Sequence, residues 1–238
     1  MKKSCLVVLS GGQDSTTCLF WAKQRYKDVH AITFDYGQRH KIEIESARKV
    51  AQMAEVKSHE VVSVPNCLIS SSPLTSNNEL EVYSSYEKME KIIGGRREIT
   101  FVPMRNALFL TIAANRAESI GANSIVTGVC QMDAANYDDC RKTFLIATEQ
   151  YINTALGHDH RETPWVAVEA PLLFLSKADS IHLAKTIPGC MNALAYSHTC
   201  YAGEFPPCGK CHSCVLRAQG FSDAGVIDPL VDRCINHG

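Results

Sequence analysis

Four cysteines near the C-terminal end of the chain have the spacing of a metal site. They stand out among the eleven cysteines because they lie close together in a segment rich in glycine and proline: Cys200, Cys208, Cys211 and Cys214. Four soft thiolates around one point suit tetrahedral zinc, and in a reducing compartment such a cluster indicates metal ligation rather than disulfides. An iron–sulfur cluster and free or redox-active thiols are the alternatives. We expect structural zinc.

A second motif follows the first apolar run of the chain. Leu6–Leu9 leads directly into the sequence SGGQDST, and a helix is predicted to begin there. Two glycines allow close approach of the backbone to a ligand, and a helix N-terminus offers free amides and the positive end of its dipole. Ser15 and Thr16 add hydroxyl donors. The motif therefore predicts an anion site.

This loop lacks the lysine of a Walker A motif, so it is less suited to holding a γ-phosphate for transfer. It resembles the SGGxDS motif of the PP-loop ATP pyrophosphatases, which split ATP between its α and β phosphates. Such enzymes use the AMP group to activate a carboxylate or amide oxygen for displacement by a nucleophile. Asp14 is a candidate magnesium ligand, and capping of the helix is an equally good interpretation.

Short apolar runs alternate with amphipathic segments along most of the chain, which favours a parallel sheet covered on both faces. We predict strands at Leu6–Leu9, Val29–Phe34, His59–Val64, Ser124–Gly128 and Trp165–Glu169. We predict helices at Thr16–Tyr26, Ile42–Glu55, Asn106–Ser119, Arg141–Ala155 and Ser176–Thr186. The expected fold is a Rossmann-like, doubly wound α/β domain of about five strands over residues 1–190, with a surface insertion or flap at 65–97. A small zinc module is expected to occupy 191–238.

Polar segments follow several of the predicted strands, where ligands bind in open α/β sheets. Three arginines there are candidate clamps for phosphates or a substrate carboxylate: Arg39, Arg105 and Arg141. Asp133 or Asp139 could accept hydrogen bonds from a guanine-like edge, and Tyr137 could stack on a ring. Lys177 either opens a helix or reaches a phosphate. We interpret Cys130 as a packed cysteine at a strand end, because the glycine of a glutaminase elbow does not follow it.

Composition narrows the range of partners. The chain has 238 residues, 24 basic and 25 acidic, for a net charge of −1. Nucleic-acid binding usually leaves a basic footprint, so we expect a small-molecule substrate and no direct nucleic-acid partner. The apolar run near the N-terminus is too short for a signal peptide, and no apolar stretch reaches the ~20 residues of a membrane helix. We expect a cytoplasmic protein with no membrane partner.

Taken together, the motifs resemble the 7-cyano-7-deazaguanine synthase family over nearly the full chain. The segments that carry the resemblance are LSGGQDSTTCL, TFDYGQRH, FVPMRN, YDDCR, APLLFLSKAD and PCGKCHSCVLRAQGF. The resemblance implies that a deazaguanine acid is adenylated, captured by free ammonia as the amide, and adenylated again to give the nitrile. It also implies zinc at the four cysteines, magnesium, a homodimer and a product that serves tRNA or DNA modification.

The resemblance further implies where ATP binds, whereas the catalytic and substrate-binding candidates follow from the motifs and from the polar segments at the strand ends. ATP would lie along Leu9, Ser10, Gly11, Gly12, Gln13, Asp14, Ser15, Thr16, Thr17, Cys18 and Leu19. The catalytic candidates are Asp14, Ser15, Arg105 and Lys177. The substrate-binding candidates are Arg39, Asn106, Asp133, Tyr137, Asp139 and Arg141.

The chain departs from the family at 131–141, where members usually read ETDFSGYPDCR and this chain reads QMDAANYDDCR. The departure leaves open a variant that stops at the amide or serves DNA modification or defence. Another PP-loop ligase that modifies tRNA, and a zinc-stabilised nucleotide-binding protein without catalysis, are the remaining alternatives.

Overall fold

The computed structural model describes residues 2–64, 66–130, 137–158 and 164–236, and within these ranges five strands form one parallel sheet. The spatial order is β3-β2-β1-β4-β5. The strands are β1 (Lys2–Val8), β2 (Tyr26–Asp35), β3 (Ser58–Ser63), β4 (Ser124–Val126) and β5 (Ala167–Glu169). The order reverses between β1 and β4, which is where doubly wound sheets bind their ligands. The predicted five-stranded, doubly wound sheet is confirmed.

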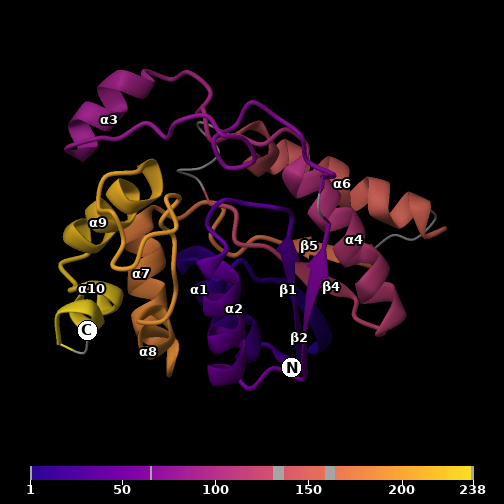
Figure 1. The fold of residues 1–238 in the computed structure, drawn as a ribbon. Coiled ribbons are helices and arrows are strands. Elements are labelled where there is room, and N and C mark those ends of the chain that lie inside the picture. Colours follow the sequence, from indigo (N-terminus) through magenta and orange to yellow (C-terminus); the bar gives the residue numbers. More distant parts are fainter. Residues whose placement is uncertain (1, 65, 131–136, 159–163, 237–238) are drawn as a thin grey trace.

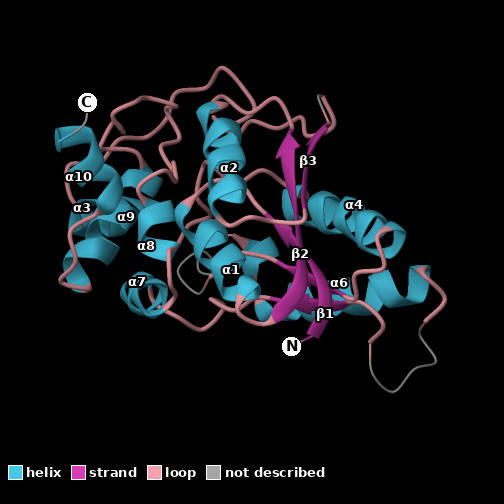
Figure 2. Ribbon diagram, turned by 90° about the horizontal axis from the view of Figure 1, so that it is seen from below, coloured by secondary structure: helices cyan, strands magenta, loops and turns pink. Residues whose placement is uncertain are grey.

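Helices cover both faces of the sheet (Figures 1 and 2). One face carries α1 (Gln13–Lys23), α2 (Ile42–Met53), α7 (Lys177–Thr186) and α8 (Cys190–Leu194), whose buried side chains share one core cluster with β1. The other face carries α4 (Arg105–Ser119) and α6 (Lys142–Ala155) around a second cluster. Burial on both faces explains the nearly continuous apolar runs of the central strands.

Predicted element boundaries are wrong by a few residues where a distant partner decides them. Tyr26 was expected to end the first helix but begins β2, because its hydroxyl hydrogen-bonds Ser124 Oγ at 2.9 Å and also reaches Glu169. The helix ends earlier, at Lys23. These partners lie on β4 and β5, so local propensity did not reveal them.

The segment at 65–97 contains a helix that the sequence did not predict, α3 (Tyr86–Ile93). Ser85 caps its start by accepting from Lys88 N at 3.3 Å, and Gly94 ends it with φ +53°. The apolar face of α3 packs against α9 (His212–Asp223) through Met89, which is fully buried (Figure 1). The segment therefore lies against the C-terminal module, while its motion as a flap stays a prediction.

The C-terminal part of the chain is built from α9, the loop that precedes it and α10 (Pro229–Asn236). It docks on the sheet domain where α9 meets α7. Gly220 permits this contact, because a Cβ there would lie 2.7 Å from Lys177 Cβ. In the described part of the chain, no helix is long and apolar enough to cross a membrane.

Candidate active site

A cavity of about 220 Å³ opens at the carboxyl edge of the sheet. The ends of three strands reach it: Leu9 follows β1, Phe34 belongs to β2, and Thr127 follows β4. The helix starts of α1, α4, α7 and α9 also reach it. A cavity at this edge is where an α/β sheet of this topology is expected to bind a ligand.

The loop from Ser10 to Ser15, here called the glycine loop, forms one wall. Ser10 Oγ lies 2.9 Å from Ser15 Oγ and accepts from Gly12 N at 3.2 Å. Gly11 has φ +88°, and a Cβ there would lie 2.2 Å from the carbonyl oxygen of Glu43, so only glycine fits. No side chain caps α1, which leaves the amides of its first turn available to an anion.

Lys177 faces the glycine loop from the start of α7. Its Nζ lies 2.6 Å from Asp14 Oδ2 and donates to Cys130 Sγ at 3.1 Å. A capping box between Ser176 and Asp179 fixes the first turn of α7 and so positions the lysine. Cys130 is fully buried in the core, as expected for a packed cysteine, and it also accepts this hydrogen bond. The lysine thus places a cation beside the anion site.

The start of α4 forms the opposite wall and carries Arg105 and Asn106. Asn106 donates from its backbone to Asp139 Oδ2 and from its side chain to Asp139 O, both at 3.1 Å. Tyr137 lines the cavity and its hydroxyl lies 2.6 Å from Thr100 Oγ1. Burial raises the pKa of Asp139 above its ordinary value, although Arg105 and the Asn106 amide act in the opposite direction.

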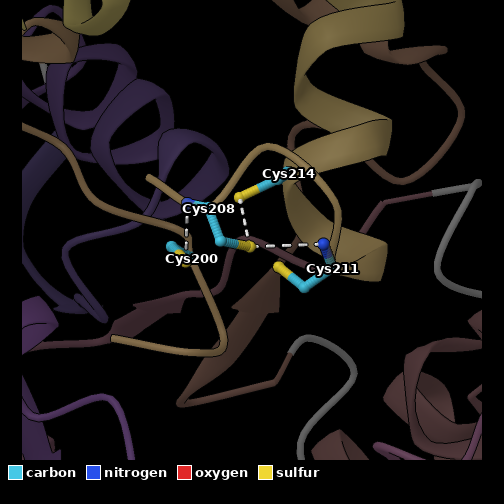
Figure 3. A group of neighbouring side chains, drawn as sticks. All are labelled: Cys200, Cys208, Cys211 and Cys214. Carbon is cyan, nitrogen blue, oxygen red and sulfur yellow. Dashed lines mark hydrogen bonds between the residues drawn. The ribbon is translucent and has the colours of Figure 1, made fainter. Parts of the chain in front are cut away.

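The four clustered cysteines come together as the spacing predicts (Figure 3). Their sulfur atoms all lie within 4.8 Å of one another. Backbone amides point at two of them, with Cys208 N donating to Cys200 Sγ at 3.4 Å and Cys211 N to Cys208 Sγ at 3.3 Å. Amide donors of this kind stabilise thiolates, and a set of four sulfurs suits tetrahedral zinc. The residues therefore fit a metal ion.

The chain is similar to known proteins over nearly its whole length. A family model described as "Queuosine biosynthesis protein QueC" matches residues 4–225. The chain belongs to the QueC family. It is 49% identical to the 7-cyano-7-deazaguanine synthase of Laribacter hongkongensis over 232 residues, covering 96% of this chain and 94% of that protein. The synthase of the same description from Chromobacterium violaceum is 47% identical, covering 98% and 94%, and that from Gloeobacter violaceus 45%, covering 96% and 95%.

Ten of the site residues predicted from the sequence line this cavity. The lining residues predicted from the sequence are Leu9, Ser10, Gly12, Gln13, Asp14, Ser15, Arg105, Asn106, Tyr137 and Lys177. Gly11, Thr16, Thr17, Cys18 and Leu19 lie behind this surface, where Thr17 Oγ1 donates to Gln13 O at 3.0 Å and supports the loop. Asp139 lies behind Asn106 and holds it.

Two substrate-binding candidates of this QueC-family chain, Arg39 and Arg141, are placed elsewhere. Arg39 donates to the carbonyl oxygens of Ser76 and Asn78, at 3.4 and 3.0 Å, and so holds the 65–97 segment. Arg141 is exposed and pairs with Asp138 at 2.9 Å. Asp133 lies outside the described residues.

The other lining residues were not among the named site candidates, although Tyr36, Thr127, Gly128, Val129 and Cys140 belong to polar segments at predicted strand ends. They are Val8, Phe34, Tyr36, Glu43, Phe109, Thr127, Gly128, Val129, Cys140, His198, Thr199, Tyr201, His212, Ser213, Leu216 and Arg217. Glu43 accepts from Gln38 Nε2 at 3.0 Å and lies 3.2 Å from His40 Nε2. The TFDYGQRH segment pointed to this region of the cavity. Glu43 lies just after that segment, in a predicted helix, and its sequence context did not distinguish it from an ordinary residue of a helix start.

Proposed function

We propose that the chain is an ATP-dependent carbon–nitrogen ligase that converts 7-carboxy-7-deazaguanine and ammonia to 7-cyano-7-deazaguanine. The names of its close relatives support this substrate and product. The observation that carries the proposal is that one cavity holds an uncapped helix N-terminus with Lys177 on one wall and an arginine among aromatic rings on the other. The first wall suits phosphates, and the second suits a planar acid.

The reaction has two stages that each consume one ATP. The substrate carboxylate attacks the α-phosphorus and pyrophosphate leaves, which forms an acyl adenylate. Ammonia attacks the carbonyl carbon and loses a proton, and AMP leaves with the electron pair of its bond to carbon. The amide oxygen then attacks a second α-phosphorus, with loss of a proton from nitrogen and of pyrophosphate. Loss of the last N–H proton expels AMP and leaves the nitrile.

Within this scheme the residues of the chain mainly position groups and stabilise departing anions. The amides of the first turn of α1 and the Ser15 hydroxyl would hold the phosphates. Lys177 would balance the charge that develops on pyrophosphate, and Asp14 holds its ammonium group in place. Asp14 lines the cavity and is the carboxylate we propose for magnesium, which would neutralise phosphate charge when bound.

The cysteine site would have a structural role. Its loop and the start of α9 supply one side of the cavity, with Thr199, Tyr201, His212 and Arg217 among the lining residues. We propose that zinc holds this loop closed and so completes the cavity. A homodimer, free ammonia as the nitrogen source and a cytoplasmic location are proposals that rest on family resemblance.

The test is mass spectrometry of the products formed from 7-carboxy-7-deazaguanine, ATP, magnesium and ammonium. We expect the nitrile together with AMP and pyrophosphate. Accumulation of the amide would mean that this chain has lost the second adenylation. Absence of any turnover, with ATP still bound, would refute the substrate assignment. Activity that requires glutamine in place of ammonium would refute the nitrogen source.

A further inference from the structure

Arg105 brings a positive charge to the cavity from the start of α4. Its guanidinium lies close to Tyr36, and among the described residues no ion pair joins it to a carboxylate. An arginine side chain is charged at any ordinary pH, and a half-buried charge in a cavity is stabilised by an anion beside it.

Asp139 is the nearest candidate for that anion, but it offers Arg105 only a weak counter-charge. Its Oδ2 already accepts from Asn106 N at 3.1 Å, and burial raises its pKa, which weakens it as a counter-charge. Tyr36 is not an anion either, because burial raises its pKa to about 12, despite the opposing effect of Arg105. Within the described part of the chain Arg105 thus has no full counter-charge, and we expect a ligand to supply one.

Two anionic groups would enter the cavity, an ATP phosphate and the substrate carboxylate. The groups suited to phosphate are the glycine loop and Lys177, at the starts of α1 and α7. These helices pack on one face of the sheet, whereas Arg105 begins α4 on the other face (Figure 1). The position of Arg105 separates it from the phosphate donors and favours the carboxylate.

The side chains next to Arg105 suit a planar ring. Phe109, one turn further along α4, lines the cavity and stacks on Phe34 with ring centroids 4.1 Å apart and planes 7° apart. Tyr36 is tilted against Phe109 at 5.4 Å. A guanidinium presents two parallel N–H donors that match a carboxylate, and aromatic side chains bind a flat ring by stacking.

We propose that Arg105 binds the carboxylate of the deazaguanine acid and thereby selects the acid over the amide in the first half-reaction. This inference rests on the proposed function, since it concerns the same substrate. The amide has no negative charge, so its binding would depend far less on Arg105. The two substrates of one enzyme thus provide an internal comparison.

The experiment measures the Kd of the acid and of the amide by calorimetry, for the zinc-loaded wild type and for Arg105→Gln. We expect the acid to bind about 30- to 100-fold more weakly to the variant, and the amide to change by less than about 3-fold. Arg116→Gln is the matched control, because Arg116 lies on the same helix and pairs with Glu60 on the surface at 3.0 Å. That control is expected to leave both affinities unchanged.

Equal weakening of acid and amide, or no weakening of either, would overturn the assignment of Arg105. If Arg105→Gln fails to fold, the same measurement is made on Arg105→Lys, which keeps the positive charge but loses the two parallel N–H donors of the guanidinium. We expect this variant to bind the acid at least about 10-fold more weakly, with no such loss for the amide. Wild type that binds the acid but makes no product would refute the proposed function and leave the role of Arg105 standing. Wild type that binds neither compound would overturn both.

Discussion

Asp228→Ala should destabilise the protein more than any comparable surface change. Asp228 accepts from Arg217 Nε at 2.6 Å and Nη2 at 2.8 Å, and the two side chains are 9% and 6% exposed. Arg217 also donates to Ser197 Oγ and Leu194 O, so the pair connects α9 to the end of α8. Asp228 Oδ1 additionally accepts from Leu230 N at the start of α10.

The expected magnitude follows from these contacts. Removal of one partner of a buried ion pair leaves an uncompensated charge and costs about 3–5 kcal/mol. Loss of the hydrogen bond at the start of α10 adds about 1 kcal/mol. For a chain of this length, the sum corresponds to a fall in Tm on the order of 10–20 °C.

The assay is thermal unfolding followed by circular dichroism on protein with full zinc content, with guanidinium chloride unfolding as a second measure. Asp223→Ala is the control, because Asp223 is exposed and accepts a hydrogen bond from Gln219 Nε2 at 2.7 Å on the same helix. Its effect should stay within about 0.5 kcal/mol. The double variant Arg217→Met/Asp228→Leu removes both charges and should recover part of the loss. If Asp228→Ala is no worse than Asp223→Ala, the reasoning about the buried pair is wrong.

Two further predictions concern the cavity. Gly128→Ala should weaken ATP binding at least about 10-fold while the protein stays folded. A Cβ at this position would lie 2.9 Å from Ser15 N and would displace the start of α1. ATP titration of the variant checks this prediction, and an unchanged affinity would contradict it. Cys211→Ser, or removal of zinc by a chelator, should lower Tm and turnover together, since structural zinc is coupled to folding. Metal analysis and melting curves check this, and a metal-free chain that keeps its stability and turnover would contradict it.

The sequence by itself determined the features that depend on local spacing. Strand–loop–helix order placed the glycine loop at the start of α1, because the anion site needs only consecutive backbone amides and glycines. The spacing of the four cysteines predicted the sulfur cluster for the same reason, since all four lie in one short segment. The alternation of strands and helices predicted the parallel sheet and the edge at which the cavity lies.

Contacts between distant segments were decided only by the tertiary structure. Glu43 reaches the cavity because α2 packs on the glycine loop at Gly11. His198 N donates to Gly11 O at 2.8 Å, and this hydrogen bond joins the C-terminal module to the same loop. Arg39, in contrast, does not line the cavity, because its guanidinium donates to carbonyl oxygens of the 65–97 segment. Residue type and spacing predict which groups can do chemistry, whereas the packing of helices on the sheet decides which of them face one cavity.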